Sequence, residues 1–198
     1  MKRPVVFLDR DGTLNEEVGY IHDLSKLVLI AGAGEAVRRL NQAGVAAVLV
    51  TNQSGAARGY YPEGHIRDLN SRLVKLLSEE GAHLDAVYYC PHLPDGTVPD
   101  LSFECGCRKP AVGLVEQACA ENAELDRQHA YVVGDKATDV ELARNCNAKG
   151  VLVVTGYGEK VLAGTYQWKV EPDHTAGDIV EAVDWILADL GMNAEAGK

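Results

Sequence analysis

Apolar residues along the chain alternate between short continuous runs and longer segments in which they recur every three or four positions. The short runs are rich in valine and are bounded by polar residues, which is typical of strands buried on both faces of a parallel sheet. They predict strands at residues 4–8, 45–50, 86–89, 130–133 and 151–154, and residues 168–170 add a candidate edge strand. Helical spacing predicts helices at residues 34–43, 62–80, 112–121, 138–145 and 176–190.

This alternation, with short connections, predicts an α/β fold in which helices cover both faces of a parallel sheet. The chain has 198 residues, of which 46% are hydrophobic, enough for one domain with a substantial core. No internal repeat, low-complexity tract or linker interrupts it. We therefore expect a single domain over residues 1–198.

The formal net charge of −10 argues against a broad basic surface for nucleic acid. The apolar run before Asp9 is too short for a signal peptide, and no later segment approaches the length of a membrane span. We expect a cytoplasmic protein that acts as a monomer and has no membrane partner. Five cysteines in that reducing compartment argue against a disulfide framework.

Asp9 and Asp11 directly follow the first predicted strand, in the sequence DRDGT at 9–13. The carboxyl ends of strands are where open α/β sheets bind ligands. Two crowded carboxylates repel each other unless a cation or a shared proton intervenes, which favours a divalent metal with one acid attacking while the other moves protons. The alternative is that Asp11 only caps a turn, assisted by Thr13. The nearby His22 is interpreted as a loop residue and not as a ligand.

Further polar residues follow the other predicted strands. Thr51 follows the second strand, Asp135 follows the fourth, and Asp139 comes four residues later. Arg108 and Lys109 supply cations just before the third crossover helix, where a phosphate would need them. Each residue alone has an ordinary explanation as a cap, a turn former or a surface charge. Their order and placement together favour a catalytic site at one edge of the sheet.

Three cysteines and a histidine form two Cys-x-(His/Cys) pairs separated by twelve residues: Cys90, His92, Cys105 and Cys107. Such a set closes a tetrahedral site without an open position for substrate, which favours structural Zn²⁺. Zinc would pin the loop at 90–107 and, with it, Arg108 and Lys109. Cys119 and Cys146 fall on predicted helices and are interpreted as core residues.

The motifs closely resemble those of the haloacid dehalogenase superfamily of phosphohydrolases, and the match spans nearly the whole chain. The matching residues are the motif at 9–13, Thr51, Lys109, Asp135 and Asp139. The resemblance implies a Rossmann-like sheet with Mg²⁺ held by the Asp9 carboxylate, the Asp11 main-chain carbonyl and the Asp135 carboxylate. Asp139 would support these ligands without binding the ion itself. Many relatives carry a cap domain, but the segments before Thr51 and Lys109 are too short for one. We therefore expect no cap domain.

The resemblance also implies a mechanism. Asp9 would accept the phosphoryl group as an aspartyl phosphate, which water would then hydrolyse. Asp11 would protonate the departing oxygen and later deprotonate the water. Thr51 and Lys109 would hold the phosphoryl oxygens.

The zinc loop and the stretches at 51–59 and 107–110 resemble one branch, the D-glycero-D-manno-heptose 1,7-bisphosphate 7-phosphatases. This implies removal of the 7-phosphate from a small sugar bisphosphate, in nucleotide-activated heptose synthesis for lipopolysaccharide or another surface glycan. It implies substrate contacts by Glu17, Val18, Gly19, Tyr20, Thr51, Asn52, Gln53, Ser54, Arg108, Lys109 and Lys136. Arg108, with its guanidinium fork, would bind the second phosphate, and Arg58 could assist.

Two alternatives stay open. Histidinol-phosphate phosphatases are near relatives that share the zinc loop and most of the core. A phospho-acceptor signalling domain would also combine a parallel sheet, an acidic cluster, a hydroxyl and a Lys-Pro pair. In that family the acceptor aspartate lies in mid-chain and no further carboxylate follows the lysine. Here the paired acids lead and Asp135 follows Lys109, which favours the enzyme.

Overall fold

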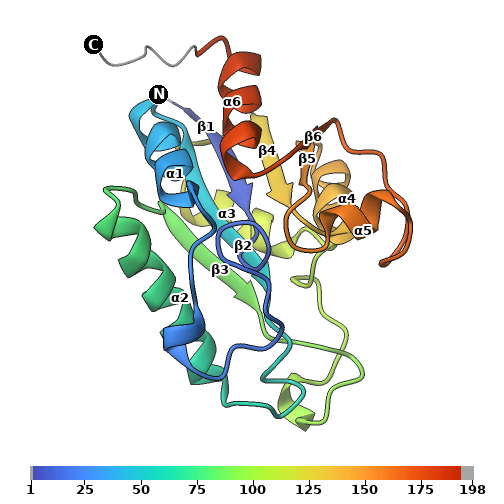
Figure 1. Ribbon diagram of the computed structural model, residues 1–198. Coiled ribbons are helices and arrows are strands. Elements are labelled where there is room, and N and C mark those ends of the chain that lie inside the picture. Colours follow the sequence, from blue (N-terminus) through green and yellow to red (C-terminus); the bar gives the residue numbers. More distant parts are fainter. Residues whose placement is uncertain (1, 193–198) are drawn as a thin grey trace.

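Six parallel strands form one sheet in the computed structural model, which describes residues 2–192 (Figure 1). Their order is β3-β2-β1-β4-β5-β6. The strands are β1 Arg3–Leu8, β2 Ala46–Asn52, β3 Ala86–Cys90, β4 Leu125–Gly134, β5 Lys149–Val153 and β6 His174–Ala176. The chain reverses its direction of travel across the sheet at β1 and β4, and open α/β sheets bind ligands outside the carboxyl ends of the strands at such a switch point.

Helices lie on both sides of this sheet (Figure 1). They are α1 Ala33–Gln42, α2 Glu63–Glu79, α3 Gly113–Glu121, α4 Ala137–Asn145, α5 Gly158–Leu162 and α6 Ile179–Asp189, with short 3-10 turns at Leu24–Lys26 and Pro99–Leu101. Val6 and Leu8 of β1 join the core formed with α1, α2 and α6, whereas Val5 and Phe7 pack with α3 and α4. Because side chains alternate along a strand, a strand covered on both faces must be apolar throughout.

The predicted parallel sheet with helices on both faces is confirmed, but the sixth strand was misplaced. The predicted edge strand at 168–170 is wrong, because Val170 is buried against α4 and α5 outside the sheet. The sixth strand is β6, and it takes in the first residue of the predicted last helix. That helix begins at Ile179, where the Asp178 side chain accepts the N–H groups of Val180 and Glu181 as an N-cap. The short helix α5 was not predicted.

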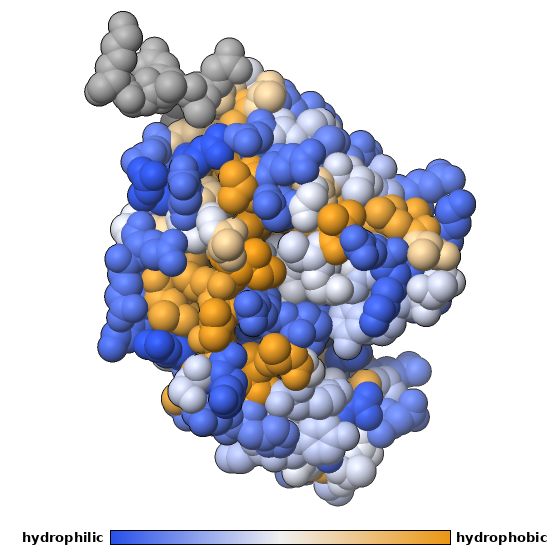
Figure 2. All heavy atoms as spheres, in the orientation of Figure 1, coloured by the Kyte–Doolittle hydropathy of each residue, from blue (hydrophilic) through white to orange (hydrophobic). Residues whose placement is uncertain are grey.

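All strands described for residues 2–192 belong to this sheet. Residues 9–32 and 91–112 each contain only one short 3-10 turn within that part of the chain, which confirms the expectation of no cap domain. None of the helices in residues 2–192 has the length and apolar character needed to cross a membrane. On the face shown in Figure 2, apolar side chains form groups broken up by hydrophilic ones.

Candidate active site

Three carboxylates meet at the switch point of the sheet. Asp9 follows β1 and Asp135 follows β4, and these two strands are hydrogen-bonded neighbours. Asp139 reaches the same place from the first turn of α4. The three side chains bring carboxylate oxygens within 4.8 Å of one another, and all three residues are buried. Negative charges this close, and this far from water, need cations beside them.

Lys109 supplies the first cation. Its Nζ lies 2.8 Å from Asp9 Oδ1 and 2.6 Å from Asp139 Oδ1, and it donates to the main-chain carbonyl of Val50 at 2.9 Å. The backbone of Lys109 is held by Asn52, whose side chain donates to the Lys109 carbonyl at 3.1 Å and accepts the Lys109 N–H at 3.0 Å. Asn52 at the end of β2 therefore fixes the position of the lysine.

Lys136 supplies the second cation. Its Nζ donates to Glu17 Oε2 at 3.1 Å, Asp135 Oδ1 at 3.2 Å and the Asp11 main-chain carbonyl at 3.2 Å, and it lies 3.8 Å from Asp9 Oδ2. The groups of Asp9, Asp11 and Asp135 are those that the resemblance assigns to Mg²⁺. A positive charge already lies against all three, and an all-oxygen donor set suits a hard divalent ion.

The surroundings separate the pKa values of the buried acids. Burial by itself would raise the pKa of Asp9, but the positive charges of Lys109 and Lys136 outweigh it and lower that pKa to about 2. Asp9 is therefore ionised at neutral pH, as an attacking group must be. Burial raises the pKa of Asp135 to about 7; Lys136 opposes this rise, and the carboxylates of Asp9 and Asp139 add to it.

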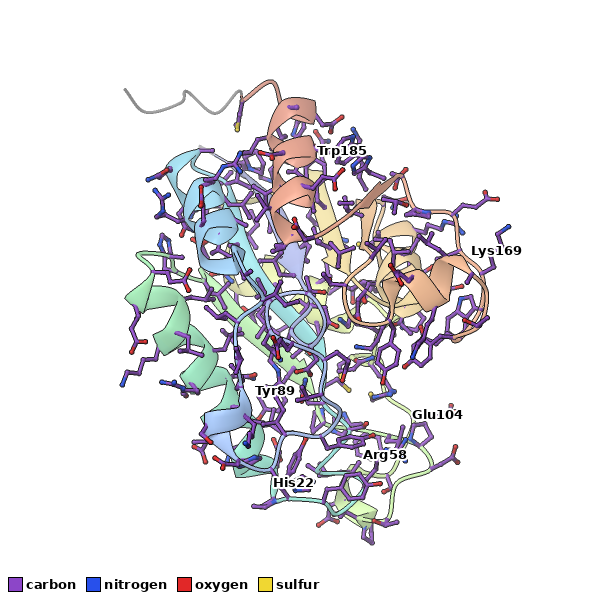
Figure 3. The ribbon with its side chains drawn as sticks, viewed as in Figure 1. His22, Arg58, Tyr89, Glu104, Lys169 and Trp185 are labelled. Atoms are coloured by element: carbon purple, nitrogen blue, oxygen red, sulfur yellow. The ribbon has the colours of Figure 1, made fainter. Side chains whose placement is uncertain are left out.

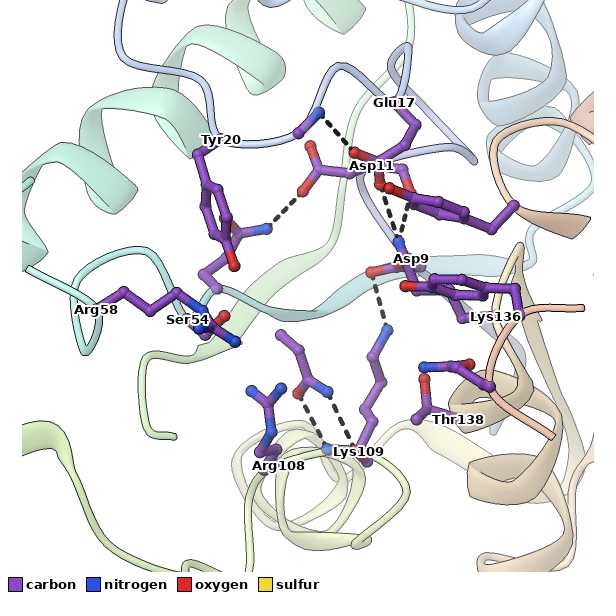
Figure 4. A pocket seen from close by; sticks show the side chains of 16 residues that line it. Asp9, Asp11, Glu17, Tyr20, Ser54, Arg58, Arg108, Lys109, Lys136 and Thr138 are labelled. Atoms are coloured by element: carbon purple, nitrogen blue, oxygen red, sulfur yellow. Dashed lines mark hydrogen bonds and ion pairs between the residues drawn. The ribbon is translucent and has the colours of Figure 1, made fainter. Parts of the chain in front are cut away.

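A polar cavity of about 280 Å³ opens beside this acidic centre (Figure 4). The predicted residues that line it are Asp9, Asp11, Glu17, Gly19, Tyr20, Asn52, Gln53, Ser54, Arg58, Arg108, Lys109 and Lys136. Two predicted contacts are not part of the lining. Val18 is 54% exposed, and Thr51 is 1% exposed, with its hydroxyl oxygen accepting the Gln53 side-chain N–H at 3.1 Å.

Two guanidinium groups bring unneutralised charge to the cavity. Arg58 and Arg108 lie across it from Lys136 (Figure 4). Arg108 donates to the His92 carbonyl at 3.1 Å, and the Arg58 guanidinium lies 6.0 Å from the centre of the Tyr20 ring. Within residues 2–192 neither arginine forms an ion pair with a carboxylate. This end of the cavity suits an anionic group of a ligand.

The cysteine and histidine side chains predicted to bind zinc converge beside the same cavity: Cys90, His92, Cys105 and Cys107. Contacts between their Sγ and Nδ1 atoms measure 3.2 to 3.7 Å. Four ligands about 2.3 Å from a tetrahedral zinc would lie roughly 3.8 Å apart. None of these cysteines forms a disulfide. The cluster therefore has the donor atoms and nearly the spacing of a closed metal site.

Three residues predicted to have no chemical role belong neither to the acidic centre nor to the cysteine and histidine cluster. The His22 ring packs against the rings of Tyr60 and Tyr61, at centroid distances of 6.2 and 5.6 Å, in the loop region shown in Figure 3. It does not line the cavity. Cys146 is buried in the core formed with α3 and α4, and Cys119 is partly buried against it. The contacts of all three side chains are therefore packing contacts.

Comparison with known proteins identifies the family. The HAD-hyrolase-like family model matches residues 106–182. The D-glycero-D-manno-heptose-1,7-bisphosphate 7-phosphatase of Thermosynechococcus vestitus (strain NIES-2133 / IAM M-273 / BP-1) is 51% identical over 194 residues, covering 96% of this chain and 98% of that protein. The chain belongs to the D-glycero-D-manno-heptose-1,7-bisphosphate 7-phosphatase family. This confirms the resemblance noted in its sequence motifs.

Two further relatives of this family support the assignment. The D-glycero-beta-D-manno-heptose-1,7-bisphosphate 7-phosphatase of Escherichia coli (strain K12) is 37% identical over 195 residues, covering 98% of this chain and 94% of that protein. The crystal structure of D,D-heptose 1.7-bisphosphate phosphatase from B. bronchiseptica, complexed with magnesium and phosphate, superimposes with a TM-score of 0.81 at 29% identity. That match covers 96% of this chain and 99% of the other.

One wall of the cavity was not predicted from the sequence, and it is formed by Thr138, Tyr157, Tyr166 and Gln167. Tyr157 follows β5, so the rule that ligand contacts gather at carboxyl ends of strands could have found it. Its N–H donates to Asp135 Oδ2 at 2.9 Å, and its ring stacks on Tyr166 at 4.1 Å. The Gln167 side chain accepts the N–H of Ala137 at 2.9 Å, and no local sequence pattern predicts this contact.

Gly12 allows Asp135 to approach the loop after β1. A side chain at position 12 should therefore lower the free energy of unfolding more than usual. Gly12 has φ +85°, and a Cβ built there would overlap the Asp135 carboxylate. Gly44 has φ +73° and no atom within 4 Å of such a Cβ, so Gly44→Ala should carry only backbone strain, about 1–2 kcal/mol. Gly12→Ala should lower the free energy of unfolding by a further ~1–3 kcal/mol through overpacking. Urea denaturation measures both, and equal losses would contradict the close approach.

Proposed function

We propose that this protein is a Mg²⁺-dependent phosphatase that removes the 7-phosphate of D-glycero-D-manno-heptose 1,7-bisphosphate. One observation supports the proposal: the cavity has two separate groups of cationic side chains, and each group could hold a phosphate. At one, the ionised Asp9 carboxylate lies between Lys109 and Lys136. At the other, Arg58 and Arg108 are not paired with a carboxylate within residues 2–192. The relatives are named as phosphatases of a heptose bisphosphate, a substrate with two phosphates.

In this proposal the chain acts in the cytoplasm as a monomeric enzyme, with one domain over residues 1–198. It would serve the synthesis of nucleotide-activated heptose for lipopolysaccharide or another surface glycan. The small polar cavity supports a small phosphorylated sugar as substrate. The net charge of −10 makes nucleic acid an unsuitable ligand.

The acidic centre would hold Mg²⁺ through the carboxylates of Asp9 and Asp135 and the main-chain carbonyl of Asp11. When bound, the ion would offset negative charge on the phosphoryl oxygens. Asp139 supports the site from behind, because its Oδ1 pairs with Lys109 and its Oδ2 accepts the main-chain N–H of Lys136 at 3.1 Å. It thereby connects the two lysines on either side of Asp9.

The residues of the chain can perform both steps of hydrolysis. An Asp9 carboxylate oxygen bonds to phosphorus while the bond from phosphorus to the sugar oxygen breaks, giving an aspartyl phosphate. Asp11 enters this step in its protonated form, gives its proton to the departing sugar oxygen and is left as the carboxylate that pairs with Arg10. Water then attacks phosphorus, Asp11 takes the proton from the water, and phosphate leaves to regenerate Asp9. Lys109 and the Thr51 hydroxyl would stabilise charge on the transferring oxygens.

Asp9→Asn tests the nucleophile. The amide keeps the shape of the side chain but removes the attacking oxygen, so phosphate release should fall by about 10³-fold or more. Folding should survive, as checked by circular dichroism. The measurement is phosphate release from the heptose bisphosphate with Mg²⁺, with Asp126→Asn, at the opposite end of β4 from the acidic centre, as control. Near-normal turnover by Asp9→Asn would refute the mechanism.

Arg108→Ala tests the substrate. The bisphosphate presents a second dianion to Arg58 and Arg108, whereas histidinol phosphate presents a cation there. The wild-type protein should therefore prefer the bisphosphate, and Arg108→Ala should lower kcat/KM for it by about 10- to 100-fold, as expected for a lost charge-assisted contact. Histidinol phosphate should be affected less. The exposed Arg127→Ala is the control, and a preference for histidinol phosphate would instead support that alternative activity.

We also propose that the cysteine and histidine cluster holds one structural Zn²⁺ per chain. Cys107 comes two residues before Lys109, so a loosened loop should misplace the lysine. Elemental analysis of Cys107→Ser should show loss of zinc, with a lower melting temperature and lower activity. Cys119→Ser, outside the cluster, should keep its zinc. Full zinc content in Cys107→Ser, or full activity after zinc is stripped from the wild type, would contradict this role.

A further inference from the structure

Three side chains hold the Asp11 carboxylate through both of its oxygens. Oδ1 accepts Arg10 Nε at 3.1 Å, Arg10 Nη2 at 2.9 Å and Asn15 Nδ2 at 3.0 Å. Oδ2 accepts Arg10 Nη2 at 2.9 Å and Gln53 Nε2 at 2.8 Å. The carboxylate is 15% exposed, and Asp11 lines the cavity beside Asp9. These contacts leave the carboxylate a single orientation at the wall of the cavity.

The burial of Arg10 depends on this ion pair. Its residue exposure is 1%, although an unpaired guanidinium is costly to remove from water. Within residues 2–192, Asp11 is the only carboxylate with which it forms an ion pair. Its remaining nitrogen, Nη1, donates to Asn70 Oδ1 at 3.2 Å. Asn70 belongs to α2, so the guanidinium ties the loop after β1 to a packed helix.

Gln53, which directly follows β2, connects the Asp11 carboxylate to that strand. Its Nε2 lies 2.8 Å from Asp11 Oδ2 and 3.1 Å from the Thr51 hydroxyl oxygen, and the residue is 4% exposed. This single amide therefore links the acid to the residue expected beside the phosphoryl group. Gln53 was predicted to contact substrate, but its side-chain nitrogen already donates to groups within the protein.

We propose that Arg10, backed by Asn70, is a positioning residue that holds Asp11 for proton transfer to the departing oxygen. This inference rests on the proposed function, in which Asp11 is the acid and then the base. A guanidinium fork fixes both carboxylate oxygens in one plane, which a lysine ammonium does not. Proton transfer requires such alignment, and a misplacement of about 1 Å can lower a rate roughly 100-fold.

The test compares two leaving groups in Arg10→Lys, which keeps the positive charge and most of the volume. A departing sugar oxygen needs the proton of Asp11, whereas 4-nitrophenolate is stable enough to leave without one. Single-turnover rates are measured with enzyme in excess and Mg²⁺ present. We expect the rate for the heptose bisphosphate to fall about 100-fold, while 4-nitrophenol release from 4-nitrophenyl phosphate changes less than about threefold.

A second readout follows the intermediate. Asp11 also takes the proton of the attacking water, so a misplaced Asp11 should slow hydrolysis of the aspartyl phosphate. With 4-nitrophenyl phosphate, acid quenching of Arg10→Lys should therefore trap more phosphorylated protein than in the wild type. A general loss of structure would lower phosphorylation and would not produce this accumulation.

Arg3→Lys is the matched control, because Arg3 pairs with Asp85 at 2.8 Å at the opposite end of β1 from Asp9. It should leave both rates unchanged. Equal loss with both substrates, or no loss with either, in Arg10→Lys would overturn the inference. If Arg10→Lys does not unfold cooperatively, Asn70→Ala provides the same comparison, and the same outcomes decide it. Absence of turnover by the wild type with both substrates would refute the proposed function itself.

Discussion

The balance of charge at the switch point is the constraint on which the rest of the structure depends. Three buried carboxylates, from Asp9, Asp135 and Asp139, bring oxygens within 4.8 Å of one another, and Lys109 and Lys136 lie against them. Removing one partner of such a group leaves an uncompensated buried charge, which typically costs about 3–5 kcal/mol. The strand order, the loops and the first turn of α4 must therefore deliver all five side chains to one place.

Different structural features position the two lysines, and neither feature takes part in the chemistry. Lys109 stands at the end of a long irregular loop. Asn52 on β2 holds its backbone, and the cysteine and histidine cluster ends two residues before it, at Cys107. Lys136 is the N-cap residue of α4, and Asp139 in the first turn accepts its main-chain N–H. A loop without regular structure can place a side chain accurately only if it is fixed at several points.

Residues 2–192 contain no cap domain, so short loops must form the walls of the cavity. Glu17 and Tyr20 come from the loop after β1, Arg58 from the loop after β2, and Tyr157 from the loop after β5. Glu17 pairs with Lys136, whereas Arg58 and Arg108 form no ion pair with a carboxylate in the described part of the chain, residues 2–192. In an open cavity of this kind, the choice of substrate depends more on where unpaired charge lies than on how completely the walls enclose the substrate.

The sequence by itself determined the five long strands, the acidic motif and the metal-type cluster, because their signals are local: continuous apolar runs, paired acids and close Cys/His spacing. Tertiary structure decided the rest. The strand at His174–Ala176 exists because β5 offers a free edge, and Gln167 reaches Ala137 across the chain. The pairing of Arg10 with Asn70, sixty residues away, depends on α2 packing into the same core as β1. Contacts between distant segments follow from packing, which no single window of sequence contains.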